Sequence, residues 1–158
     1  MKIFDAGDVI RFAVRVEEDG EYFYRQAALA AEDKGIRDVF NYLADEETKH
    51  KALFQNMLSE AQPVDRAETY DNEYGAYLRD YIDDKVIFAK KVKEDVAVYA
   101  KDPLSAITYA MQREADSILY YHEAKQFIAG KYYTVIDKII AEERKHFSRL
   151  SELRQKNV

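Results

Sequence analysis

The motif Glu-x-x-His occurs twice in this 158-residue chain, as Glu47 to His50 and as Glu143 to His146. Around each copy, apolar residues recur at alternating steps of three and four, a spacing that places them on one face of a helix. The two stripes are Ile36, Phe40, Leu43, Glu47, His50, Phe54, Met57 and Ile136, Ile139, Glu143, His146, Leu150, Leu153. A bundle helix turns such a face toward its partners, so the motif is desolvated there, which is costly without compensation. A bound metal ion would supply that compensation.

The rest of the chain predicts an all-α fold. Only 5 Gly and 2 Pro leave little material for a turn-rich β architecture, and the 34% charged residues suit amphipathic helices. Capping and breaking residues, such as the Asp102-Pro103 pair, divide the chain into segments. We predict one domain over residues 1–158, a four-helix bundle of two helical hairpins joined by a long, partly helical crossover. The predicted helices are about 5–33, 36–61, 103–129 and 132–154, and the crossover is 63–102.

The two predicted hairpins repeat the same chemistry. Glu17 lies on the apolar stripe of the first predicted helix, and Glu114 lies at the matching place on the third. Gly20 and Ser117 follow them at the same offset, as small residues that leave room beside a metal. Each hairpin therefore contributes one lone glutamate and one Glu-x-x-His motif, which is an internal repeat.

Folding the hairpins together brings four glutamates and two histidines to the middle of the bundle. This is the ligand arrangement of dinuclear iron and manganese carboxylate bundles. Four carboxylates balance the charge of two divalent ions, whereas alone they would repel one another and take up protons. Carboxylates with some imidazole favour iron or manganese over zinc or calcium, so we expect two iron ions, or one iron and one manganese. The predicted ligands, which would also be the catalytic groups, are Glu17, Glu47, His50, Glu114, Glu143 and His146.

Four further residues lie close enough to these ligands to influence them. Tyr24 and Tyr121 lie two turns after Glu17 and Glu114 on the same stripes. They are core tyrosines, hydrogen-bond donors to a ligand carboxylate, or electron relays, and we favour the carboxylate contact over the relay. Glu46 and Glu142 lie off the stripes and face solvent, with a weaker expectation that each contacts the histidine four residues after it, His50 or His146.

Composition excludes several other classes of protein. The absence of Cys rules out disulfides, zinc knuckles, iron–sulfur clusters and a rubredoxin-type iron centre. The net charge of −6, without a basic stripe, argues against a nucleic-acid or anionic-membrane partner. No segment is typical of a signal peptide or a membrane span, and we expect a cytoplasmic protein.

These motifs resemble the rubrerythrin branch of the ferritin-like superfamily over nearly the whole chain apart from the crossover. The resemblance is carried by Ala-x-x-x-Glu-x-x-Gly-x-x-Phe-Tyr around Glu17, Leu-Ala-x-Glu-Glu-x-x-His around Glu47, the segment 114–121, and Glu-Glu-x-x-His at Glu143. It implies that Glu17 and Glu114 are terminal ligands and that Glu47 and Glu143 bridge the irons. It also implies that His50 and His146 each complete one iron.

The chain departs from that family in two respects. Rubrerythrins proper carry a rubredoxin-like domain with four cysteines, so here the electrons must come from a separate donor protein. They also have a glutamate at the position of Ser117, a seventh ligand, and without it the ligand set resembles a bacterioferritin ferroxidase centre. The carboxylate–histidine exchange of that family is therefore not expected here.

Three functions remain open at this point. The first is a diiron oxidoreductase that reduces hydrogen peroxide, or less favourably dioxygen, with electrons from an external donor. The second is a ferroxidase coupled to iron storage, and the third is a metal-free helical interaction module. Tyrosines at 70, 74, 77 and 81 in the crossover predict a homodimer.

Overall fold

The computed structural model describes residues 6–60, 77, 80 and 92–157, and these described residues contain helices and no strand. The long helices are α1 (Ala6–Ala30), α2 (Lys34–Glu60), α4 (Pro103–Ala124) and α5 (Tyr133–Lys156). Two short 3-10 helices, η1 (Lys125–Phe127) and η2 (Gly130–Tyr132), connect the last two. Residues 92–99 form a further helical segment, and the rest of the predicted crossover lies almost entirely outside the described residues.

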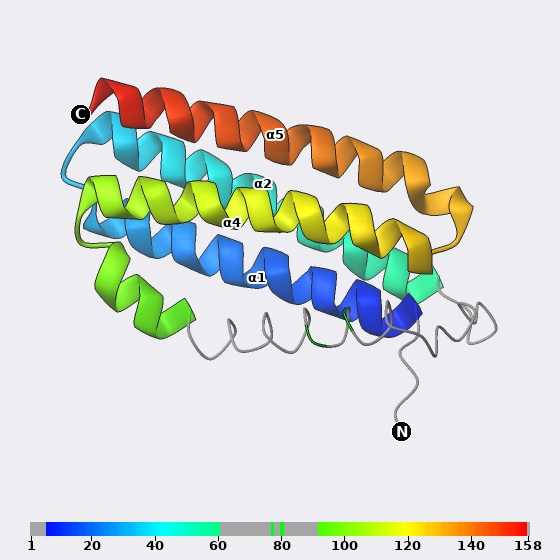
Figure 1. The fold of residues 1–158 in the computed structure, drawn as a ribbon. Helices are drawn as coiled ribbons and strands as arrows, with labels where there is room; N and C mark the ends of the chain where they lie inside the picture. The colour runs from blue at the N-terminus through cyan, green and yellow to red at the C-terminus, as the bar shows by residue number, and fades with distance from the viewer. Residues whose placement is uncertain (1–5, 61–76, 78–79, 81–91, 158) are drawn as a thin grey trace.

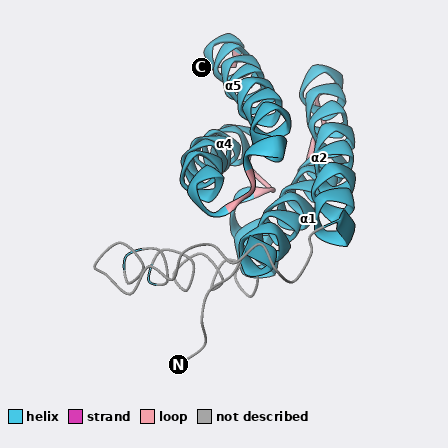
Figure 2. Ribbon diagram, turned by 90° about the vertical axis from the view of Figure 1, so that its right-hand side faces the viewer, coloured by secondary structure: helices cyan, strands magenta, loops and turns pink. Residues whose placement is uncertain are grey.

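The four long helices form a bundle of two antiparallel hairpins (Figure 1). Helix α1 packs most extensively on α2, and α4 packs most extensively on α5. Helices α2 and α4 run in the same direction, so α4 begins at the end of the bundle opposite to the one where α2 ends (Figure 1). Viewed along the bundle, the four helices surround a shared interior (Figure 2). The predicted pairing of hairpins is therefore the observed one.

Local capping explains where α2 and α4 begin. The Asp33 carboxylate accepts a hydrogen bond from the backbone N–H of Ile36 at 2.9 Å. The Asp102 carboxylate accepts one from the N–H of Ser105 at 2.8 Å, with Pro103 as the first helical residue. Both contacts satisfy backbone donors that have no partner within the helix.

Two predicted helix ends need correction. Helix α1 ends at Ala30 rather than at 33, and the Arg37 guanidinium donates to the carbonyl of Ala31 at 2.9 Å and to that of Glu32 at 3.1 Å. Helix α4 ends at Ala124 rather than at 129, and η1 follows it. Ile128, whose spacing predicts a longer α-helix, is buried directly after η1, so the apolar pattern continues through a 3-10 turn.

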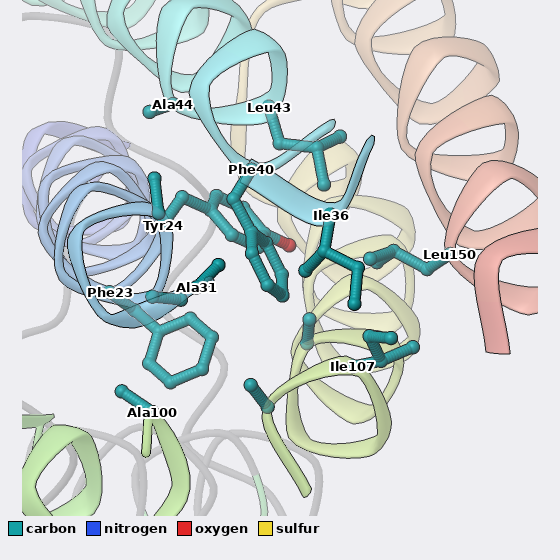
Figure 3. Close-up of a cluster of buried hydrophobic side chains, with 14 of the residues drawn as sticks. Phe23, Tyr24, Ala31, Ile36, Phe40, Leu43, Ala44, Ala100, Ile107 and Leu150 are labelled. Carbon is teal, nitrogen blue, oxygen red and sulfur yellow. The ribbon is translucent and has the colours of Figure 1, made fainter. Parts of the chain in front are cut away.

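Two hydrophobic clusters fill the interior, one toward each end of the bundle. The first joins the beginning of α1, the end of α2 and the α4–α5 connection. The second joins the end of α1, the beginnings of α2 and α4, and Leu150 of α5 (Figure 3). The glutamates and histidines of the predicted site occupy the middle of the same helices, between the two clusters. No helix in the described ranges is long and apolar enough to cross a membrane.

Candidate metal centre

The six predicted ligands meet in the interior of the bundle, and each is almost completely shielded from solvent. The most exposed of them, Glu47, has only 5% of its surface accessible. Helix α1 contributes Glu17, α2 contributes Glu47 and His50, α4 contributes Glu114, and α5 contributes Glu143 and His146. The seams predicted to bury these side chains do bury them.

The six residues separate into two overlapping groups of four, and within each group the ligand atoms lie within 4.8 Å of one another. Glu47 and Glu143 belong to both groups. The first group is completed by Glu17 and His50, and the second by Glu114 and His146. The two imidazole rings are nearly parallel, with centroids 5.7 Å apart. Two cations could therefore bind side by side and share the two carboxylates, a layout that matches the roles implied by the family resemblance.

Unsatisfied polar atoms support a metal at this place. Among the described residues, the buried side-chain atoms without a hydrogen-bond partner are Oε2 of Glu17, Oε1 of Glu47, Nδ1 of His50 and Oε1 of Glu143. All four are ligand-type atoms of the predicted site, and two of them, His50 Nδ1 and Glu143 Oε1, lie 2.9 Å apart. Buried polar atoms are nearly always satisfied in folded proteins. The donor set, of four carboxylates and two imidazoles, fits a pair of iron or manganese ions.

The two predicted tyrosines donate hydrogen bonds to ligand carboxylates, and each reaches across to the other hairpin. The Tyr24 hydroxyl on α1 donates to Oε1 of Glu114 on α4, and the Tyr121 hydroxyl on α4 donates to Oε1 of Glu17 on α1. Each tyrosine thus fixes the orientation of a glutamate that belongs to only one of the two ligand groups. The other oxygen of that glutamate remains available to a metal.

The weaker expectation for Glu46 and Glu142 is wrong in its partners. Glu142 Oε2 lies 2.8 Å from Nε2 of His50 on the opposite hairpin, not against His146 on its own helix. Glu46 interacts with Lys49 at the surface. Only one of the two histidines therefore has a carboxylate behind it, and the Nε2 atom of His146 has no such partner among the described residues.

Gly20 packs closely against one of the predicted ligands. A Cβ atom built on Gly20 would lie 2.6 Å from Oε2 of Glu47, closer than such atoms approach. The space beside this glycine, expected to be open for a metal-bound molecule, is thus filled by the Glu47 carboxylate. Gly20 and Ser117 do line one crevice together with Glu47 and Glu114, but it is too narrow to admit a water molecule.

Proton affinities show that the carboxylates crowd one another when no cation is present. Burial, together with the charges of Glu17, Glu143 and Glu114, raises the pKa of Glu47 well above its usual value. Burial and the charge of Glu143 do the same to the pKa of Glu114. Burial would also raise the pKa of Glu143, but contacts with Glu114 and both histidines outweigh it and lower that pKa.

Both imidazoles bind their protons tightly in this setting. Burial alone would lower the pKa of His50, but contacts with the carboxylates of Glu143 and Glu17 raise it to about 11. The carboxylates of Glu114 and Glu143 likewise overcome burial and raise the pKa of His146 to about 10. Protonated imidazoles thus provide the positive charge that metal ions would provide, and metal binding must release these protons.

Sequence reasoning missed two features next to the site. Arg113, beside Glu114 in the chain, donates to the carbonyl of Val16 on α1 at 3.2 Å. A surface hollow of about 440 Å³ reaches His146 from outside, and Arg149 lies over the Tyr42 ring in its wall at 4.3 Å. Both are contacts between helices that are not adjacent in sequence, which a pattern within one helix does not reveal.

The comparisons with known proteins agree with this geometry. The Rubrerythrin family model matches residues 8–154. A crystal structure described as a ferritin-like diiron-carboxylate protein of Thermotoga maritima superposes with a TM-score of 0.71. It shares 22% identity, and the match covers 100% of this chain and 99% of that one, which confirms the ferritin-like fold. A comparison with curated proteins gave no match. The family match spans most of the chain, and the chain belongs to the rubrerythrin family.

Proposed function

We propose that this chain is a dinuclear iron carboxylate oxidoreductase that reduces hydrogen peroxide, or less favourably dioxygen, with electrons from a separate donor. The observation that carries the proposal is the pair of overlapping ligand groups, which share Glu47 and Glu143. Two metal ions held by these shared carboxylates would supply a centre able to act on one oxygen–oxygen bond. Iron is favoured because its two oxidation states supply the electrons that such a reduction consumes.

The protein's own part in this chemistry is to hold the ligands in a dry, shaped interior. The six ligands are buried, and hydrophobic clusters lie on both sides of them along the bundle. Tyr24 and Tyr121 restrain the glutamates that serve one metal each, and Glu142 orients the imidazole of His50. Such outer contacts set ligand geometry and basicity in metal sites. Since α1, α2, α4 and α5 all contribute ligands, the bound metals would also tie the two hairpins together.

The two sides of the site differ in what lies outside each histidine, although both imidazoles are almost completely buried. The Nε2 atom of His50 contacts Glu142, whereas His146 is one of the residues that line the surface hollow. The hollow is also lined by Tyr42, Arg144 and Arg149. The hollow lies beside the metal position that His146 would complete, and we assign to that position the first contact with a small molecule that enters from solvent.

Stopped-flow mixing of the di-ferrous protein with hydrogen peroxide tests the proposal. We expect oxidation of both irons much faster than oxidation of free ferrous iron under the same conditions, followed by re-reduction when an electron donor is supplied. A rate equal to that of free iron would contradict it. A Glu47→Ala variant, which lacks a shared ligand, serves as the inactive control.

The same measurements separate the proposal from iron storage, the alternative that Ser117 keeps open. A ferroxidase coupled to storage would oxidise many ferrous ions per chain and retain the product. We expect oxidation of ferrous iron to stop once the ions bound at the site are oxidised. We also expect a homodimer by size-exclusion chromatography. A large hollow assembly that accumulates ferric iron would favour storage.

A further inference from the structure

A series of aromatic rings runs from the Tyr24 side of the metal site toward the surface. Tyr24, whose hydroxyl donates to Glu114, lies next to Phe23, with ring centroids 5.8 Å apart. Phe23 lies 4.6 Å from Tyr109 of α4, and Tyr109 stacks on Tyr99 at 4.9 Å with an interplanar angle of 15°.

Exposure changes along this series from the buried interior to solvent. Phe23 and Tyr24 are buried in the second hydrophobic cluster, where Phe23 lies toward Ala100 (Figure 3). Tyr109 is half-buried, and Tyr99 is 37% exposed. Tyr99 belongs to the helical segment 92–99, which packs on this end of the bundle through Val92.

The middle tyrosine has a carboxylate positioned to take its proton. The Tyr109 hydroxyl donates to Oδ2 of Asp95 at 2.9 Å. Burial raises the pKa of Tyr109 to about 12, so its hydroxyl is protonated at neutral pH and must lose a proton when the ring loses an electron. A nearby base lowers the cost of that loss.

Tyr121 is the counterpart of Tyr24 in the other hairpin, and a different series of rings begins at it. Tyr121 contacts Tyr120, and Tyr120 contacts Phe12, both of which are buried. The Tyr120 hydroxyl donates to the backbone carbonyl of Val9, which is not a base. The two branches therefore differ in the acceptor of their second tyrosine, which is the Asp95 carboxylate for Tyr109 and the Val9 carbonyl for Tyr120.

We propose that Tyr99, Tyr109, Phe23 and Tyr24 form a path that carries single electrons from the surface to the metal centre, with Asp95 as the proton acceptor of Tyr109. This inference rests on the proposed function, which needs electrons from outside the chain. Tyr109 passes one electron along Phe23 and Tyr24 toward the oxidised metal centre, and it passes its hydroxyl proton to Asp95. A neutral tyrosyl radical remains at Tyr109. A one-electron donor at Tyr99 reduces the radical, and the proton returns from Asp95. Reduction of one hydrogen peroxide to two waters consumes two electrons and two protons, so the path is used twice in each turnover.

The absence of Cys allows the path to be tested from its outer end. Val98 is 65% exposed and precedes Tyr99, so a Val98→Cys variant can carry a ruthenium photo-oxidant beside the first ring. A light flash in the iron-free full-length protein then oxidises Tyr99, and a water-soluble spin trap captures any radical that stays there. Peptide mass spectrometry measures the adduct on Tyr99, and electron paramagnetic resonance measures the lifetime of the untrapped radical.

We expect little adduct on Tyr99 in the labelled parent, because the radical moves inward to Tyr109. Tyr109→Phe, which keeps the ring and removes the hydroxyl, and Asp95→Asn, which keeps the side-chain size, should both increase the adduct several-fold. Tyr22→Phe is the matched control, since Tyr22 is also 37% exposed, and it should leave the adduct unchanged. Equal adduct in all four proteins would overturn the path.

A second experiment connects the path to turnover. In the iron-loaded protein, Tyr109→Phe should slow re-reduction of the oxidised centre by an external donor, while the first oxidation by peroxide keeps its rate. Unchanged re-reduction would overturn the role of the path in turnover. The flash experiment uses neither iron nor peroxide, so failure of the proposed function and failure of the path give different results.

Discussion

Glu142 on α5 lies 2.8 Å from Nε2 of His50 on α2, a contact between the two hairpins that joins a surface carboxylate to a buried ligand. Replacing Glu142 by Ala removes the group that fixes the His50 imidazole. We expect iron affinity to fall about 10- to 100-fold, the usual effect of losing such a partner. Titration of the metal-free protein with ferrous iron under anaerobic conditions measures this change.

Glu46→Ala is the matched control, because Glu46 holds the same position before Glu47 and interacts with Lys49 instead. Equal losses in the two variants would show that the contact has no role in metal binding.

Glu47→Ala should abolish binding of both metals, since Glu47 belongs to both ligand groups. Loss of a shared carboxylate removes a donor from each position and leaves one uncompensated positive charge. Metal analysis of the purified variant gives the answer, and Glu46→Ala again serves as control. Retention of one or two metals by Glu47→Ala would mean that the choice of helix face at this motif is wrong.

Gly20→Ala should weaken metal binding, because the added methyl group would lie 2.6 Å from the Glu47 carboxylate and displace it. Isothermal titration with ferrous or manganous ions measures the change in affinity. Gly130→Ala is the control, since a Cβ there meets nothing within 4 Å and Gly130 has no positive φ angle. We expect that control to bind metal normally and to be as stable as the parent or slightly more so. Normal metal binding by Gly20→Ala would show that the Glu47 side chain can shift away from the added methyl group and still bind metal.

The metal-free protein should become less stable as the pH rises above 6.5, the ordinary pKa of histidine. The pKa values of His50 and His146 are raised in the folded chain to about 11 and about 10, so the folded state holds protons that the unfolded state has released. Their contribution to the free energy of unfolding is therefore fully present below pH 6.5 and is lost as the pH rises toward 10 to 11. The raised pKa values of Glu47 and Glu114 act in the same direction, beginning at their ordinary value of 4.5.

Thermal unfolding followed by circular dichroism tests this pH dependence. The lowered pKa of Glu143 gives a contribution of opposite sign, but it is lost only as the pH falls below 4.5, outside the range considered. The melting temperature of the metal-free protein should therefore decrease between 6.5 and 10. The iron-loaded protein should lack this decrease, because bound metals replace the protons. A flat or rising melting temperature in the metal-free protein would contradict the electrostatic account.

Much of the bundle and the grouping of the ligands could be predicted because both depend on spacing within single helices. An apolar stripe with steps of three and four residues fixes which face of a helix is buried. Glu17 and Glu114 lie on such stripes and could be selected as ligands, whereas Glu18 lies off the stripe and could be excluded. The predicted end of α4 is too late because Ile128 continues the apolar stripe beyond Ala124 and is buried, although a 3-10 turn separates the two residues. Helix ends are the least determined part of such a pattern.

Contacts between hairpins were beyond the sequence for a different reason. Glu142 was expected to face solvent because it lies off the stripe of its own helix, yet its carboxylate reaches His50 from across the interface. The tyrosine contacts were predicted in kind but not in partner, since spacing cannot say which hairpin Tyr24 or Tyr121 will reach. Of the crossover tyrosines that suggested a dimer, only Tyr77 is among the described residues, where it is 46% exposed.

If the buried carboxylates and imidazoles hold two metal ions, the metal content of the purified protein must show it. The protein should be purified without chelator and analysed by inductively coupled plasma mass spectrometry alongside a quantitative amino-acid analysis. We expect two transition-metal ions per chain, mainly iron, and a large drop in melting temperature when they are removed. A protein that carries no transition metal, takes up none on titration and is equally stable with and without chelator would contradict it.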